Sequence, residues 1–139
     1  MNKLLTMSIL GILAVTTPTA AQRTPAPPDA YLYIGWPNDG EVVGRQFRAW
    51  FGLRGMGVAP AGVTKESTGH HHMIIDAPLP PLDEPVPADK NHLHFGAGQT
   101  ETLIELPPGK HTLQLLMGDA DHIPHDPPVV SKKITITVK

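Results

Sequence analysis

The sequence contains no cysteine, few aromatic residues and no apolar run long enough to span a membrane. Without cysteine, the chain has neither a disulfide framework nor a thiol for catalysis or metal binding. A site for a soft transition metal must therefore use histidine, methionine or carboxylate ligands. The longest apolar run, residues 4–15, is shorter than the roughly 20 residues that a membrane-spanning helix needs.

Strong positive charge is also missing, since 11 Lys and Arg residues face 13 Asp and Glu residues. No basic stripe occurs, so nucleic acid is not an expected partner.

Ser67 and Ser131 are the only serines after residue 21, and neither lies in a Gly-x-Ser-x-Gly nucleophile motif. No phosphate-binding loop or dinucleotide fingerprint is present. These absences favour a non-enzymatic protein.

The amino-terminal segment is typical of a secretion signal. Lys3 supplies positive charge, an apolar run follows over residues 4–15, and Thr19-Ala20-Ala21 offers small residues for cleavage. We therefore predict a signal peptide over residues 1–21, a protein that is periplasmic or secreted, and no membrane attachment after cleavage. The alternative is that the segment is retained as an anchor.

The remainder predicts one domain of short strands. After a Pro-rich leader over residues 22–29, glycine and proline interrupt the single domain 30–139 every few residues, which favours turns over long helices. Candidate strands cover residues 31–34, 46–54, 70–76, 100–106, 111–117 and 131–139, with a shorter one at 41–44. The expected fold is all-β, an immunoglobulin-like antiparallel β-sandwich of about six or seven short strands.

All eight histidines lie between His70 and His125, in four groups. In an extended strand, His70 and His72 point to one face and His71 to the other. The pair His92 and His94 repeats this spacing. Two imidazoles at positions i and i+2 can reach one ion with bonds of roughly 2.0 to 2.1 Å. The spacing therefore indicates a metal site.

The loop over residues 118–126 adds further donors, because it carries two histidines among Asp119, Asp121 and Asp126. These carboxylates could ligate an ion or orient an imidazole. His111 begins a strand after a Pro-Pro-Gly turn and is expected at the other end of the domain. The predicted metal ligands are His70, His72, His92, His94, His122 and His125, with Met56 as an additional soft ligand.

Copper is the expected ion and zinc the alternative, because imidazole suits both and affinity for a common site peaks at Cu(II). Calcium and magnesium fit poorly without a dense carboxylate loop. The predicted function is copper binding, buffering or delivery, with no protein partner specified. The alternatives are a structural β module with ordinary histidines, a histidine pH switch and a copper-dependent redox enzyme.

Three segments also resemble a known family. They are GHHHMIID at residues 69–76, NHLHFGAGQTE at 91–101 and LPPGKHTLQLLMGD at 106–119. In these the chain is similar to a bacterial exported domain-of-unknown-function family, the one catalogued as forty-three ninety-nine. The resemblance covers nearly all of residues 30–139. It implies an exported domain, and it implies no activity.

Overall fold

The computed structural model describes residues 22–139, which form nine β-strands. The predicted secretion signal, residues 1–21, lies outside the described part of the chain. Within that part, no helix is long and apolar enough to cross a membrane. The strands are β1 (Tyr31–Trp36), β2 (Val42–Val43), β3 (Gln46–Arg54), β4 (Gly57–Val58), β5 (Thr68–Ile75), β6 (His92–His94), β7 (Glu101–Glu105), β8 (Gly109–Gly118) and β9 (Ile134–Val138).

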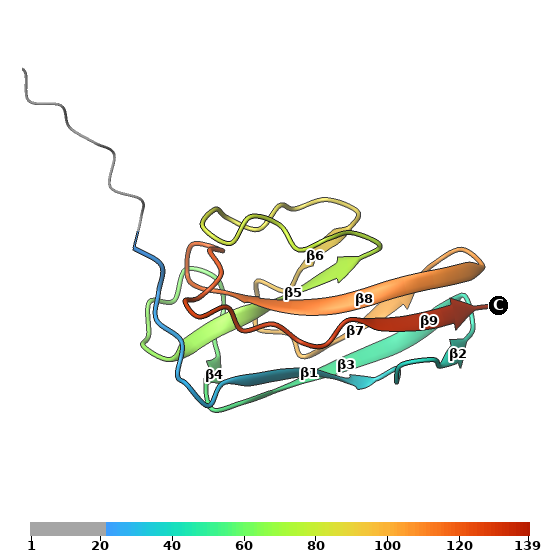
Figure 1. Ribbon diagram of the computed structural model, residues 1–139, viewed down its shortest axis with the longest axis horizontal. Coiled ribbons are helices and arrows are strands. Elements are labelled where there is room, and N and C mark those ends of the chain that lie inside the picture. The colour runs from blue at the N-terminus through green and yellow to red at the C-terminus, as the bar shows by residue number, and fades with distance from the viewer. Residues whose placement is uncertain (1–21) are drawn as a thin grey trace, which may run out of the picture.

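The strands form two sheets (Figure 1). The small sheet has the order β1-β3-β7, and the large sheet has the order β2-β9-β8-β5-β4, with β6 also paired to β5. The two longest strands of the large sheet, β5 and β8, run antiparallel through its middle. The central strand β5 carries three consecutive histidines, His70 to His72.

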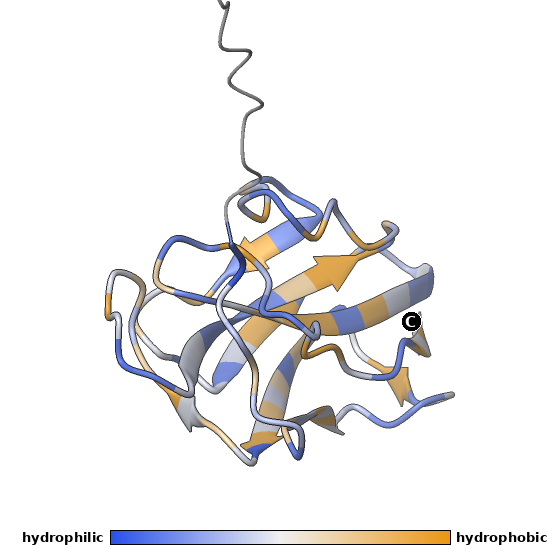
Figure 2. Cartoon of the chain, turned by 60° about the vertical axis from the view of Figure 1, so that its left-hand side comes forward, coloured by the Kyte–Doolittle hydropathy of each residue, from blue (hydrophilic) through white to orange (hydrophobic). Residues whose placement is uncertain are grey.

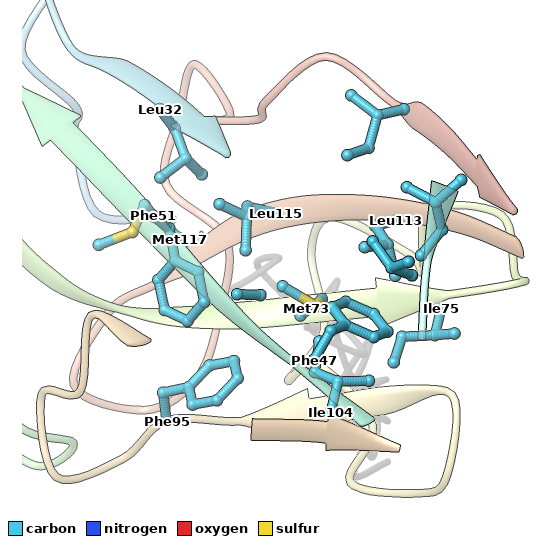
Figure 3. Close-up of a cluster of buried hydrophobic side chains, with 14 of the residues drawn as sticks. Leu32, Phe47, Phe51, Met73, Ile75, Phe95, Ile104, Leu113, Leu115 and Met117 are labelled. Atoms are coloured by element: carbon cyan, nitrogen blue, oxygen red, sulfur yellow. The ribbon is translucent and has the colours of Figure 1, made fainter. Parts of the chain in front are cut away.

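The main core lies between the two sheets. Along β3 the side chains of Phe47, Ala49 and Phe51 are buried and the residues between them are exposed. Alternating hydrophilic and hydrophobic bands are visible along strands of the domain in Figure 2. Phe47 and Phe51 from the small sheet pack with Met73 and Leu115 from the large sheet (Figure 3). Burial of these apolar side chains contributes about 1.5–3 kcal/mol each, so this cluster holds the sheets together.

The opposite face of the large sheet has a second, smaller apolar cluster. Ile74 of β5 and Leu116 of β8 pack there against Val86. Val86 belongs to the Pro-rich connection 77–91, which lies over this face. Covered on both faces, β5 is buried along almost its whole length.

The all-β class is confirmed, and residues 46–54 form β3 as predicted. The prediction of six or seven strands was too low, because β4 and β6 are too short to show alternation in the sequence. The expectation of purely antiparallel pairing was also wrong, since β2–β9 and β4–β5 are parallel pairs. An immunoglobulin-like sandwich stays a prediction.

The Pro-rich leader is held against the domain. It runs beside the loop that follows β8 (Figure 1), where the Asp126 N–H donates to the Thr24 carbonyl at 2.9 Å. The Ala26 N–H in turn donates to the Asp126 carbonyl at 3.1 Å. These bonds attach residues 24–26 to the histidine-bearing loop.

Candidate metal site

Four imidazole rings meet on the face of the large sheet opposite the main core. We call His70, His72, His94 and His122 the histidine cluster. Its ring centroids lie 4.7 Å apart for His70–His72, 5.0 Å for His70–His94, 5.0 Å for His70–His122 and 4.7 Å for His94–His122. Residues separated by up to 52 positions along the chain thus form one compact group of nitrogen donors.

Strand geometry places three of these rings. His70 and His72 share one face of β5 because side chains alternate along a strand. In the antiparallel pairing of β5 with β6, His72 lies directly opposite His94. Side chains at paired positions point to the same face, so the His94 ring stands beside the His72 ring at 5.2 Å.

A loop places the fourth ring. His122 adopts the left-handed backbone conformation with φ of 69°, which non-glycine residues rarely use. Its N–H donates to the Asp119 carbonyl at 3.0 Å, and its own carbonyl accepts from the Val86 N–H at 2.9 Å. Hydrogen bonds on both sides therefore hold this unfavourable conformation and turn the imidazole toward the sheet.

Two glycines leave room for the rings. A Cβ atom on Gly118 would lie 2.7 Å from Cε1 of His72 and 3.2 Å from Cα of His122. A Cβ on Gly96 would lie 2.6 Å from Nε2 of His94. The backbone at Gly96 therefore passes close to the His94 ring. The need for glycine at position 118 was missed.

The two β5 imidazoles of the cluster are buried and unpaired. His70 is 0% exposed and His72 is 1% exposed, and within residues 22–139 neither ring has a hydrogen-bond partner at Nδ1 or Nε2. Leaving a buried polar group unpaired costs about 1–3 kcal/mol. A bound ion would remove this cost by giving the nitrogens a partner.

His70, His72 and His94 are neutral near pH 7. Burial, with the adjacent His122 and His94, lowers the pKa of His70 from 6.5 to about 4. Burial, with His70 and His94 nearby, lowers the pKa of His72 to about 3. The pKa of His94 is also lowered, by burial and by His122. Only a neutral imidazole has the lone pair that a metal ion needs.

One ring nitrogen from each of His70, His94 and His122 lies within 4.8 Å of the other two. This spacing allows the three to hold one metal ion, with His72 adjacent as a fourth donor. His70 is buried, whereas His94 is exposed and His122 is partly so. An ion can therefore approach from the side of β6 and the 118–126 loop.

The middle histidine of β5 has a different environment. As predicted from alternation, His71 points to the main core, where its ring centroid lies 4.9 Å from that of Phe51. Burial lowers the pKa of His71 to about 4, against a smaller opposing effect of the Gln99 backbone. In the part of the chain that the structure describes, neither ring nitrogen of His71 makes a hydrogen bond of normal geometry.

Three of the predicted ligands lie elsewhere. Nδ1 of His92 is 2.8 Å from a carboxylate oxygen of Asp89. His125 lies over Gly69, on the main-core side of β5, and its Nε2 bonds the Thr68 carbonyl at 3.1 Å. Met56 packs against the main core cluster. The structure thus brings together four of the seven predicted residues.

His111 lies apart from the cluster, at the start of β8. Its Nδ1 lies 2.6 Å from Asp76 and its Nε2 lies 2.8 Å from the Pro107 carbonyl. Burial alone would lower the pKa of His111, but the bonds to Asp76 and Pro107 outweigh it and the pKa is raised. Its exclusion from the candidate ligands agrees with this position.

Comparison with known proteins gives one result. A profile of a domain of unknown function, DUF4399, matches residues 49–139. The matched region includes all four members of the histidine cluster and excludes the leader. No curated protein and no solved structure matches the chain. The chain therefore belongs to the DUF4399 family, whose description assigns no function.

Proposed function

We propose that this protein binds one transition-metal ion in the histidine cluster, as an exported copper-binding protein that buffers or delivers the ion. Copper is the first choice and zinc the alternative. Together with the secretion signal predicted from the sequence, this gives a periplasmic or secreted metal carrier. The proposal includes no catalytic step.

One observation supports this proposal most strongly. His70 and His72 bury four ring nitrogens without a hydrogen bond among the described residues, at a position where two further imidazoles converge. A structural histidine normally finds a partner when buried, as His111 does with Asp76. Coordination of an ion gives the ring lone pairs the partner that the protein does not supply.

The donor set also indicates the class of ion. All four candidate ligands are imidazoles, and Met56 packs in the core instead of adding a thioether. Neutral nitrogen donors suit Cu(II) and Zn(II), and the general order of affinity peaks at Cu(II). Calcium and magnesium require oxygen ligands. Nitrogen-only coordination also favours Cu(II) over Cu(I), which prefers sulfur.

The direct test compares two histidines of the same short strand. We expect His94→Ala to lower the Cu(II) affinity by more than the roughly 10- to 100-fold loss typical of residues outside the ligand set. His92→Ala is the matched control and should bind like the wild type, because His92 is engaged with Asp89. Isothermal titration of untagged, metal-free protein purified from the periplasm measures both.

Equal affinities of the two variants would remove the histidine cluster from consideration. A folded wild-type protein that binds neither Cu(II) nor Zn(II) would favour the structural β module instead. Parallel titrations with both ions decide which one the cluster prefers.

The glycine beside the cluster provides an independent prediction. Gly118→Ala should weaken Cu(II) binding about 10- to 100-fold, because the added methyl group would displace His72 or His122. Gly44→Ala is the control, since a Cβ there would lie 3.8 Å from the Gln46 carbonyl oxygen, an ordinary van der Waals contact. Unchanged affinity in Gly118→Ala, with an unchanged circular dichroism spectrum, would contradict the proposed ring positions.

A further inference from the structure

The loop that carries His122 is organised around one carboxylate. Oδ1 of Asp119 accepts hydrogen bonds from the N–H groups of Asp121 at 2.9 Å and Ile123 at 3.0 Å. These two residues flank His122 in the sequence. The side chain of Asp119 is buried, with 8% of the residue exposed. Its carboxylate thus holds the turn in which His122 takes its left-handed conformation.

The other carboxylate oxygen binds the leader. Oγ1 of Thr24 donates to Oδ2 of Asp119 at 2.6 Å. Beside this bond, Nε of Arg23 donates to the Pro124 carbonyl at 3.0 Å, and a second guanidinium nitrogen donates to the His125 carbonyl. The leader therefore attaches to the loop on both sides of His122, from a part of the chain that the family match does not include.

We infer that Thr24 and Asp119 form a positioning pair that holds His122 within the metal site, so that docking of the leader sets the metal affinity. This inference rests on the proposed function. Neither residue is a ligand. Asp119 acts through the backbone of the loop, and Thr24 fixes the orientation of the Asp119 carboxylate.

Charge supports the same assignment. The buried carboxylate of Asp119 is hydrogen-bonded to the backbone on either side of His122. A bound divalent ion would bring positive charge into the histidine cluster, and a nearby buried carboxylate stabilises that charge. Asp119 thus contributes both loop geometry and a compensating charge. Residues of this kind outside the ligand set typically change metal affinity by about 10- to 100-fold.

The test is a double-mutant cycle on the mature protein, with Cu(II) as the probe. We expect Asp119→Asn to lower Cu(II) affinity about 10- to 100-fold and to remove one nitrogen coupling from the electron paramagnetic resonance spectrum. Asp121→Asn is the matched control, an exposed acid on the same loop, and should bind like the wild type. In a His122→Ala background, Asp119→Asn should cause at most a small further loss, because the ligand that it positions is gone.

Thr24→Val provides a second, milder variant, which removes the hydroxyl and leaves every backbone hydrogen bond of the loop. It should lower the affinity in the same direction, and again only while His122 is present. The inference would be overturned if both Asp119→Asn and Thr24→Val bound Cu(II) with wild-type affinity. It would also be overturned if the losses in binding free energy caused by these variants were fully additive with the loss caused by His122→Ala. Either result would leave the proposed function intact. A wild-type protein that binds no Cu(II) would overturn both.

Discussion

The metal-free protein is expected to lose stability steeply as the pH falls from 6.5 toward 4. Three consecutive histidines have lowered pKa values in the folded state, about 4 for His70, about 4 for His71 and about 3 for His72. In the unfolded chain each takes up a proton near pH 6.5, so acid favours unfolding. The contribution of these three histidines to the free energy of unfolding is therefore complete above pH 6.5 and is lost as the pH falls toward their lowered pKa values.

The size of this effect follows from the shifts. The pKa is lowered from 6.5 to about 4 for His70 and His71 and to about 3 for His72, which corresponds to roughly 3 to 5 kcal/mol per histidine. Three such residues approach the whole free energy of unfolding of a typical domain, about 5–15 kcal/mol. We therefore expect cooperative acid unfolding before pH 4 is reached, measured by urea titrations at a series of pH values.

His71 provides the control, because it lies among apolar side chains and is not a candidate ligand. His71→Leu should reduce the dependence of stability on pH by about a third, and it should keep Cu(II) binding. His111 acts in the opposite sense, since its raised pKa gives a contribution that is lost as the pH rises. A free energy of unfolding that stays constant between pH 6.5 and 4 would contradict the buried, neutral state of the β5 histidines.

The second large effect is stabilisation by the ion itself. At pH 7, Cu(II) at 100 times its dissociation constant should raise the free energy of unfolding by about 2.7 kcal/mol. For a domain of this size, that corresponds to an increase in the melting temperature of roughly 10 °C. A chelator should reverse the increase. Differential scanning calorimetry with and without the ion measures it.

The same experiment on His94→Ala distinguishes the histidine cluster from adventitious surface binding. His94 is exposed and contributes little to the core, so its replacement should abolish the thermal shift and leave the metal-free melting temperature nearly unchanged. A variant that is stabilised as much as the wild type would show that the ion binds elsewhere.

Much of this arrangement can be predicted from the sequence, but only those parts that depend on local strand geometry. Alternation along β5 correctly separates His71 from His70 and His72, because the side-chain period of a strand depends on nothing outside it. Alternation also places Phe47 and Phe51 in the core. Likewise, the apolar and turn residues around residues 46–54 were sufficient to predict β3.

The positions of the other candidate ligands depend on contacts that residue spacing cannot reveal. His92 and His94 have the same spacing as the β5 pair, yet Asp89 engages one and leaves the other free. His122 and His125 belong to one loop, but the backbone conformation at His122 sends the two rings to opposite faces of β5. That conformation depends on Asp119. From the sequence alone, the carboxylate of Asp119 could either orient an imidazole or ligate an ion.

Because β5 carries histidines on both faces, the affinity for a metal ion would depend on whether this strand is paired in the correct register. A slip of one residue in the register of this strand would turn its two cluster rings into the apolar interior and present His71 alone to the ion. Such a chain would lose two nitrogen donors at once and gain only one. An ion at limiting concentration would therefore select molecules whose central strand is correctly paired, and would disfavour those that have folded out of register.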